Sequence, residues 1–194
     1  MRAGKVRYIG CSNLPAWSLM KALAVSREQR LERFKSTQSY YSLAGRELER
    51  EMIPLLKDQG LGLLVWSPLA GGFLSGKFTR DSGDDAARRA KFDFPPVDKD
   101  KGFRILDVLV TIANAHKVTV PQIALAWILA NDAVTSVIIG ARKIAQLEDN
   151  LKSIDVALTA DDMKALDEAS KLAMEYPAWM DVLGSDRRPG ERRY

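Results

Sequence analysis

The sequence predicts an α/β protein built on a parallel sheet, and three observations lead to this prediction. Short apolar segments alternate along the chain with segments typical of helices. Residues 61–66 are apolar on both faces of a predicted strand, as parallel sheets require. Two strand-to-loop junctions, over 65–72 and 137–142, end apolar runs in small residues, and the second leads directly into a helix. Such junctions present N–H groups and a cation to a phosphate, so together they predict a phosphorylated cofactor at one end of the fold.

The first half of the chain alternates without interruption. Pro15 suits the first turn of a helix, because its φ is preset and the N–H that it lacks would have no helical partner there. Acidic residues open the next helix, and Gly60 is its predicted stop. In order, we expect a strand over 6–11, a helix over 15–27, a strand over 34–38, a helix over 47–58 and a strand over 61–66.

A long segment over 67–102 interrupts the alternation. It holds many of the glycines together with Pro68, Pro95 and Pro96, and loops of this length are usually functional covers or disordered. Further on, Thr159 is a predicted N-cap, followed by acidic residues in the first helical turn. The elements expected here are helices over 103–116 and 120–130, a strand over 136–139, a helix over 144–153 and a helix that begins after Thr159.

The number of strands indicates which α/β architecture to expect. Alternating parallel strands and helices form either a doubly wound sheet or a (β/α)8 barrel, and a barrel needs eight strands. We count about four, and the first begins almost at Met1. The sequence therefore predicts roughly the C-terminal half of a TIM-type barrel, with two sheet edges left open.

Composition excludes several classes of site. A hydrophobic content of 46% with 28% charged residues is typical of a soluble globular protein. Cys11 is the only cysteine and His116 the only histidine, so CxxC metal sites and multi-histidine zinc sites are excluded. We expect His116 on the surface in the last turn of a helix, where a cation favours the helix dipole. No apolar run reaches membrane-spanning length and the N-terminus lacks a signal-peptide core, so we expect a cytoplasmic protein without membrane contact.

The net charge of +4 comes partly from arginines near the C-terminus. No aromatic residue except Tyr194 lies among them, so we interpret them as a solvated or disordered tail and expect no contact with nucleic acid. The arginines in question are Arg187, Arg188, Arg192 and Arg193.

Residues 71–77 match most of a phosphate-binding P-loop, G-x-x-x-x-G-K. Phe78 stands where that motif needs the Ser or Thr whose hydroxyl holds magnesium, and no helical pattern follows. We therefore reject a nucleoside triphosphatase and retain a Gly-rich loop that carries one phosphate-seeking lysine, Lys77.

Two residues at predicted strand ends are candidates for contact with a cofactor. Trp66 is either a core aromatic or a flat surface on which a base stacks, and the neighbouring Ser67 and glycines favour the stacking surface. Strand ends at the carboxyl edge form the active face of an α/β barrel. Gln38 could hydrogen-bond an amide there, and a buried structural glutamine explains it about as well.

The junction at 140–142 and the helix after it form the strongest candidate site. Gln146 and Asn150 are four apart and share one helical face, with Asp149 alongside. A helix N-terminus favours an anion, and Arg142 can fork onto a phosphate. Capping and surface solvation remain the alternative.

These motifs together closely resemble the aldo-keto reductase superfamily, and their order and spacing match from residue 4 to about 172. The Trp-Ser-Pro-Leu and Gly-Ala-Arg forms resemble the bacterial branch related to the potassium-channel β subunits. The resemblance implies a domain over 1–172 that is half of a (β/α)8 barrel, with 67–102 as a cofactor-covering loop and 173–194 as a tail. The matching segments are 4–13, 38–43, 66–72, 76–78, 138–142 and 146–147, with residue 150.

The resemblance also implies that NADP(H) is bound in an extended pose without a Rossmann fold. The nicotinamide carboxamide would be held by Ser12, Asn13 and Gln38, with Trp66 stacked on the ring. The pyrophosphate region would be lined by Ser67, Pro68, Leu69, Ala70 and Gly72, with Lys77 and Arg88 reaching phosphate from the long loop. The adenosine 2′-phosphate end would be enclosed by Gly140, Arg142, Gln146, Asp149 and Asn150. Many relatives have Glu where this chain has the shorter Asp149.

The family's catalytic Asp, Tyr, Lys and His lie in the first half of the barrel, upstream of Met1 in this chain. Tyr40 and Tyr41 belong to the Gln-containing strand motif, so we expect no catalytic residue and no metal site here. The resemblance implies an oxidoreductase that reduces aldehydes and ketones, small-molecule carbonyl substrates, by hydride transfer, with this chain supplying the cofactor-binding half. The alternative is a catalytically inactive fragment that binds cofactor or pairs its open strands with another copy.

Overall fold

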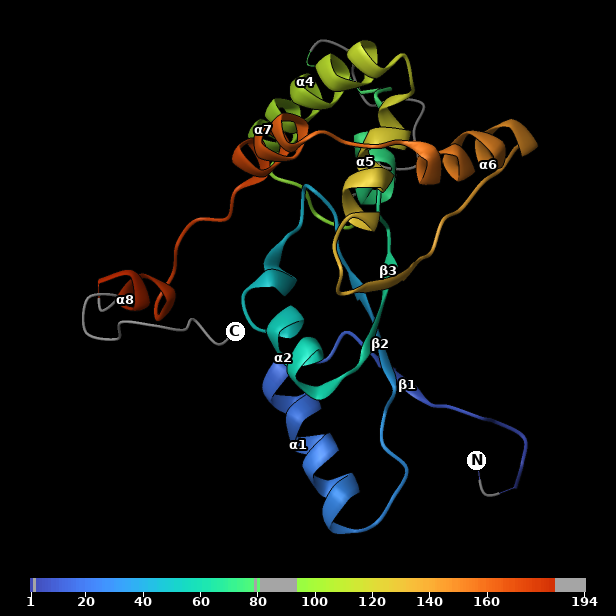
Figure 1. The fold of residues 1–194 in the computed structure, drawn as a ribbon, viewed down its shortest axis with the longest axis vertical. Helices are drawn as coiled ribbons and strands as arrows, with labels where there is room; N and C mark the ends of the chain where they lie inside the picture. Colours follow the sequence, from blue (N-terminus) through green and yellow to red (C-terminus); the bar gives the residue numbers. More distant parts are fainter. Residues whose placement is uncertain (2, 79, 81–93, 184–194) are drawn as a thin grey trace.

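A four-stranded parallel sheet organises the chain (Figure 1). The structure is a computed structural model that describes residue 1 and residues 3–78, 80 and 94–183. The strands are paired in sequence order, β1-β2-β3-β4, so β1 and β4 are the two edges. Their bounds are Gly10–Ser12 for β1, Ser36–Tyr40 for β2, Gly62–Trp66 for β3 and Val134–Val137 for β4.

Helices connect the strands and gather in two groups. In Figure 1, α1 and α2 lie side by side near one end of the sheet, while α4, α5 and α7 are grouped near the other. The α-helices are α1 Ala16–Glu28, α2 Met52–Gln59, α4 Lys99–His116, α5 Val120–Leu129, α6 Ile144–Leu151, α7 Ala160–Ser170 and α8 Ala178–Leu183. The shorter 3-10 turns are η1 Glu47–Glu49, η2 Ala70–Ser75 and η3 Lys152–Asp155.

The two faces of the sheet differ in burial. Side chains alternate between faces along a strand, and Leu63 and Val65 of β3 are fully buried in the core. The opposite face carries the row Ser12–Gln38–Leu64–Ser136, in which the three polar residues are exposed and Leu64 is half-buried. We call this row the inner row, because this face would line the interior of a closed barrel. The prediction of an α/β fold that is half of a (β/α)8 barrel is confirmed.

Several helix ends follow the predicted local chemistry. Gly60 ends α2 in the left-handed conformation, with φ of 61°. Thr159 caps α7 through a capping box with Asp162. Pro121 lies in the first turn of α5, where it costs no helical hydrogen bond.

The predicted bounds of the first strand and of the helix over 47–58 are wrong. The strand expected over 6–11 is paired only over Gly10–Ser12, because β2 begins at Ser36 and no described strand lies beside residues 6–9. The helix expected over 47–58 is divided into η1 and α2, because Glu51 departs from helical geometry with φ of −137°.

Two strands are shifted relative to the predictions, and one helix begins earlier. The strand expected over 34–38 lies at 36–40, and the strand expected over 136–139 lies at 134–137. The α4 helix starts at Lys99 rather than at 103, because Asp98 accepts a hydrogen bond from the N–H of Lys101 and caps the helix. Gly102 therefore lies inside the helix, where a Cβ would come within 2.6 Å of the Phe73 ring.

His116 differs from its predicted surface position. Its side chain is 25% exposed, and its Nε2 lies 2.8 Å from Oδ2 of Asp162, so it joins the end of α4 to the capping box of α7. None of the described helices is by itself long and apolar enough to cross a membrane; α4 and α5 reach that length and hydropathy only as a pair bent by 98°.

Candidate functional site

The predicted nicotinamide residues meet at the carboxyl ends of β1, β2 and β3. The indole Nε1 of Trp66 donates to Oδ1 of Asn13 at 2.9 Å, and Nδ2 of Asn13 donates to Oγ of Ser12 at 2.9 Å. The Ser12 hydroxyl donates to the Gln38 carbonyl at 2.9 Å, which also accepts the N–H of Asn13 at 3.2 Å. We call these four residues the strand-end network. It fixes the indole relative to two neighbouring strands.

The network uses a strained backbone at Asn13. This residue has φ of 54°, a left-handed conformation that asparagine tolerates better than most residues. The turn lets the Asn13 side chain reach across to β3. A carboxamide has both N–H donors and a C=O acceptor, so it needs an acceptor and a donor from the protein. Beyond the two bonds that it makes, the Asn13 side chain retains one N–H and one lone pair and can supply both. The exposed Gln38 side chain provides a second amide beside it.

Two aromatic rings contact Trp66. The Tyr40 ring lies 5.2 Å from the indole, tilted by 36°, and the Phe94 ring lies 5.5 Å away and is stacked at 11°. Sequence reasoning missed Phe94 as a neighbour, because it lies 28 positions further along the chain and no periodic pattern points to it. Its position directly before Pro95-Pro96 gives no signal of a ring contact.

The turn after β3 is held by its own hydrogen bonds. Ser67 and Ala70 have φ of 50°, and Gly71 and Gly72 also have positive φ, so the backbone follows a conformation that few residues adopt. The N–H groups of Ala70, Gly71 and Gly72 donate to the Ser67 carbonyl, the Ser67 hydroxyl and the Leu69 carbonyl. These three amides are therefore already engaged. The Pro68 and Ala70 side chains are buried and Leu69 is half-buried, so the turn is anchored in the core.

Lys77, beyond this turn, is exposed. The predicted phosphate residue Arg88 lies outside the described residues. Arg80 is described nearby and forms an ion pair with Asp107 of α4 at 2.8 Å, while its guanidinium lies 5.5 Å from the Phe103 ring.

The second junction lies beside the first. The N–H of Ile138 donates to the Val65 carbonyl at 2.8 Å, so the chain leaves β4 at the sheet edge where Trp66 ends β3. Gly140 and Arg142 follow as exposed residues. The ends of β3 and β4, which lead to Trp66 and toward Arg142, thus lie at the same end of the sheet.

Two side chains of α6 hold the helix to neighbouring segments: Gln146 near its start and Asp149 near its end. Oε1 of Gln146 accepts the N–H of Arg142 at 2.9 Å. The Asp149 carboxylate accepts bonds from Oγ1 of Thr119 at 2.8 Å and Nε2 of Gln122 at 2.7 Å, both from the start of α5. Asn150 is buried. Asp149 therefore holds α6 against α5, a structural role that its spacing in the sequence does not reveal.

Neither tyrosine of β2 and its following loop presents a free phenol. The Tyr40 hydroxyl lies 2.9 Å from Oγ of Ser42, and the buried Tyr41 hydroxyl donates to Oε1 of Glu49 at 2.7 Å. Burial, followed by the hydrogen bond to Glu49, raises the pKa of Tyr41 well above its usual value. The phenol of Tyr41 is thus held protonated in a structural cluster.

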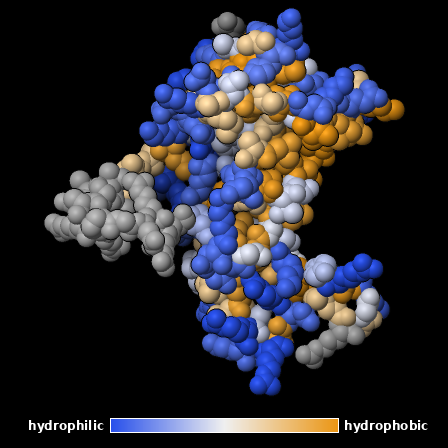
Figure 2. Space-filling view, in the orientation of Figure 1, coloured by the Kyte–Doolittle hydropathy of each residue, from blue (hydrophilic) through white to orange (hydrophobic). Residues whose placement is uncertain are grey.

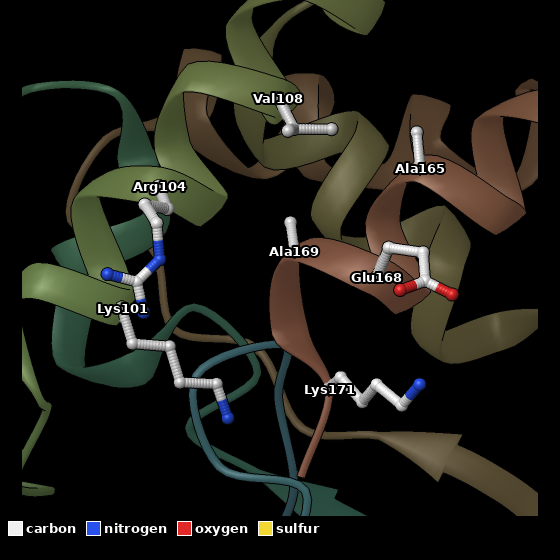
Figure 3. A pocket seen from close by; sticks show the side chains of 7 residues that line it. All are labelled: Lys101, Arg104, Val108, Ala165, Glu168, Ala169 and Lys171. Carbon is white, nitrogen blue, oxygen red and sulfur yellow. The ribbon is translucent and has the colours of Figure 1, made fainter. Parts of the chain in front are cut away.

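A cavity of about 450 Å³ lies elsewhere, between α4 and α7 (Figure 3). Figure 3 shows Lys101 and Arg104 on the α4 side, with Glu168 and Lys171 on the α7 side. It contains none of the predicted cofactor residues. Among the described residues, no group of three His, Cys, Asp or Glu side chains is placed to hold a metal ion.

The comparisons with known proteins agree with this geometry. The model of the Aldo/keto reductase family matches residues 1–171. The chain belongs to the aldo/keto reductase family. Uncharacterized oxidoreductase YrpG of Bacillus subtilis (strain 168) is 36% identical over 87% of this chain and 50% of its own length.

Two further relatives show the same coverage. Aryl-alcohol dehydrogenase GME11368 of Pestalotiopsis microspora is 31% identical over 90% of this chain and 44% of its own length. Protein tas of Escherichia coli (strain K12) is 33% identical over 91% of this chain and 51% of its own length. The chain thus spans about half the length of the curated relatives it matches, and their names and family indicate an oxidoreductase.

Proposed function

We propose that this aldo/keto reductase chain binds NADP(H) and forms the cofactor-binding part of an enzyme that reduces aldehydes or ketones. The strand-end network is the observation that supports this proposal best. It joins the indole to the side-chain amide of Asn13 at the carboxyl edge of a parallel sheet, where α/β barrels bind ligands. A nicotinamide consists of a flat ring with a carboxamide, so it matches both groups.

The second junction would hold the phosphate end of the same molecule. Arg142 is exposed at the start of α6, where a guanidinium can bind a phosphate through two parallel hydrogen bonds. The N-terminus of α6 adds a partial positive charge. A 2′-phosphate distinguishes NADP(H) from NAD(H), so Arg142 is the residue that would confer this preference.

Bound NADPH would supply the hydride, and a positioned acid would have to protonate the carbonyl oxygen. The phenols of Tyr40 and Tyr41 are both engaged, which supports the view that neither serves as this acid. The family resemblance assigns the catalytic acid to the half of the barrel that this chain does not match. We therefore propose that the 194-residue chain binds the cofactor and has negligible carbonyl reductase activity by itself.

The second candidate function is cofactor binding or assembly without catalysis. The open edges at β1 and β4 favour it, since both present strand backbone that no described strand pairs with. The two candidates can be separated by mixing the chain with a polypeptide that carries the N-terminal half of a family member. Carbonyl reduction by the mixture would support the enzyme. Cofactor binding without any activity in the mixture would support the module.

Titration of NADPH and NADH into the purified chain, followed by calorimetry, tests the proposal. Trp66→Ala should weaken NADPH binding about tenfold, because stacking and the lost ring area contribute roughly 1–2 kcal/mol. Trp66→Phe should retain most of the affinity. Trp179→Ala, which removes an indole in α8, is the matched control and should bind like the wild type.

Arg142→Ala should weaken binding of NADPH about tenfold or more and leave NADH binding unchanged. Unchanged NADPH affinity in Trp66→Ala would contradict the stacking role. Equal losses for both cofactors in Arg142→Ala would contradict the 2′-phosphate role.

A further inference from the structure

The cavity between α4 and α7 takes no part in the proposed cofactor site. Its volume of about 450 Å³ is in the range of small-molecule sites. The α4 helix follows β3, which is paired with β2 on one side and with β4 on the other. The lining residues belong to α4, to α7 and to the residue directly after α7, so none comes from an edge strand. The shape of the cavity therefore does not depend on what pairs with β1 or β4.

The α4 wall of this cavity carries two cations. Lys101, Arg104 and Val108 are three and four residues apart, so they lie on one side of the helix. Within the described part of the chain, neither the Lys101 nor the Arg104 side chain forms an ion pair or a hydrogen bond. Lys101 also lies in the first turn of α4, where the positive end of the helix dipole disfavours a cation. The α4 wall thus holds positive charge that no carboxylate within ion-pair distance offsets.

The pKa of Lys101 reflects these surroundings. Burial lowers this pKa below its usual value, and the nearby charge of Arg104 lowers it further, although Glu47 and Asp98 act in the opposite direction. The ammonium is therefore partly desolvated and repelled by its neighbour. A bound anion would remove this unfavourable interaction.

The α7 wall supplies room for a ligand. Ala165 and Ala169 are four residues apart on α7, and their small side chains form an apolar part of the lining together with Val108. Glu168 and Lys171 are exposed on the same wall (Figure 3). In Figure 2, hydrophilic residues predominate over the surface where Figure 1 places α7. Three cations and one carboxylate give the whole lining a net charge of +2.

We propose that this cavity binds a small phosphate monoester, with the phosphoryl group at Lys101 and Arg104 and the organic part against the apolar lining. A phosphate monoester has a charge of about −2 at neutral pH, which matches the charge of the lining. A guanidinium binds phosphate through two parallel hydrogen bonds, and an ammonium adds a point charge. Glu168 repels a second anionic group, so the ligand carries one phosphoryl group and no further acid. This site is separate from the proposed cofactor site and does not depend on it.

Backbone amide NMR shifts of the purified chain, followed during titration with phenyl phosphate, test the site. One equivalent should bind with a Kd of about 1 mM or below, and the shifts should be concentrated in α4 and α7. Inorganic phosphate should bind about threefold more weakly, because it lacks the organic part that covers the apolar lining. Sodium chloride at the same ionic strength is the control for screening and should produce no saturating shift there.

Two substitutions in the cavity should act in opposite directions. Arg104→Met should weaken binding of phenyl phosphate about tenfold, because it removes charge-assisted hydrogen bonds. Glu168→Gln should tighten binding about threefold, because it removes a repelling carboxylate. Lys99→Met changes an exposed cation of the same helix outside the lining, so it is the matched control and should leave the Kd nearly unchanged. All three side chains are exposed, so we expect these variants to fold.

The phosphates of NADPH require that the two sites be distinguished. Arg142→Ala should leave binding of phenyl phosphate unchanged, and Arg104→Met should leave the Kd for NADPH unchanged. Shifts that saturate around Arg142 instead of in α4 and α7 would overturn the proposal, and so would a Kd that neither cavity substitution changes. Equal affinity for phenyl phosphate and inorganic phosphate would overturn the choice of a monoester, because the apolar lining would then contribute nothing.

Discussion

The Trp66 indole has an aromatic partner within the chain, Phe94. Phe94 is stacked on it with an interplanar angle of only 11°. A nicotinamide stacked on the same face would have to displace this ring, and the lost ring contact would subtract from the binding free energy. The affinity for NADPH therefore depends on competition between Phe94 and the nicotinamide for the same face of the indole.

Phe94→Ala should tighten binding of NADPH about fivefold, because it removes a competing contact of roughly 1 kcal/mol. The Kd from calorimetry is the measurement. Phe103→Ala is a control aromatic truncation on α4, away from the indole, and should leave the Kd unchanged. A weaker Kd in Phe94→Ala would mean that Phe94 supports the bound ring instead of competing with it.

At the scale of single residues, strand ends were the predictable part of the site. Ser12 and Trp66 end β1 and β3, and parallel strands bring their carboxyl ends to one edge. The prediction that Gln38 also ends a strand is wrong, because β2 continues to Tyr40 and Gln38 is its middle residue. Phe94 and the partners of Asp149 could not be predicted, since each contact joins positions far apart in sequence with no shared periodicity. The prediction that Asp149 helps to enclose the adenosine 2′-phosphate end did not include its bonds to Thr119 and Gln122.

At the scale of elements, one arginine ties the loop after β2 to α5 and α7. Arg46 makes two bonds to the Glu49 carboxylate, at 2.7 and 2.9 Å, and one to Asp167 at 2.9 Å. Its guanidinium also lies 5.0 Å from the Trp127 ring. The side chain is only 13% exposed, so these bonds are largely shielded from water.

Arg46→Met should lower the free energy of unfolding by about 2 kcal/mol, because it leaves two carboxylates without their shielded partner. Urea unfolding at neutral pH is the measurement. Arg50→Met breaks the pair with Glu175, whose side chain is 65% exposed, and should cost less than about 1 kcal/mol. Equal losses for the two variants would contradict the structural role assigned to Arg46.

The junction of α4 and α7 gives a pH-dependent prediction. Burial alone would raise the pKa of Asp162, but hydrogen bonds from Thr159 and His116 outweigh it and lower the pKa below the usual value. With a lower pKa in the folded state, the ionised carboxylate stabilises the fold above the unfolded value, and this contribution is lost as pH falls through the folded value. The relevant range lies below about pH 4.

Asp162→Asn should cost about 1 kcal/mol of unfolding free energy at neutral pH, and the difference from the wild type should shrink below about pH 4. Urea titrations over this range measure it. Asp161→Asn changes an exposed neighbour in the same first turn of α7 and serves as the control. A difference that persists undiminished in acid would contradict the assigned hydrogen bonds.

Among the elements, local signals predicted helix caps better than strand ends. The caps at Gly60 and Thr159 depend on a single residue, so composition shows them directly. Strand bounds depend on the neighbouring strand, which is why the pairing of residues 6–9 and the shift of β4 were not visible in the sequence. The α4 helix was predicted too short because Gly102 resembles a break until its packing against Phe73 is known.

At the scale of the whole molecule, cofactor binding and carbonyl reduction should be separable. The purified chain, verified by mass, should oxidise NADPH with a panel of aromatic aldehydes no faster than the buffer control does. The reason is the lack of a positioned acid among the described tyrosines around Trp66. Loss of NADPH absorbance with time is the measurement, and aryl-alcohol dehydrogenase GME11368 of Pestalotiopsis microspora is the comparison enzyme. Turnover that survives further purification would overturn this prediction.

The inner row has a consequence for the kind of molecule that the concave side of the sheet can accept. Ser12, Gln38 and Ser136 give this side a polar lining, and the Trp66 indole adds an aromatic surface at its carboxyl end, stacked with Phe94. A purely hydrocarbon ligand would leave the hydroxyl and amide groups of this lining without water or hydrogen-bond partners, so the surface selects against it.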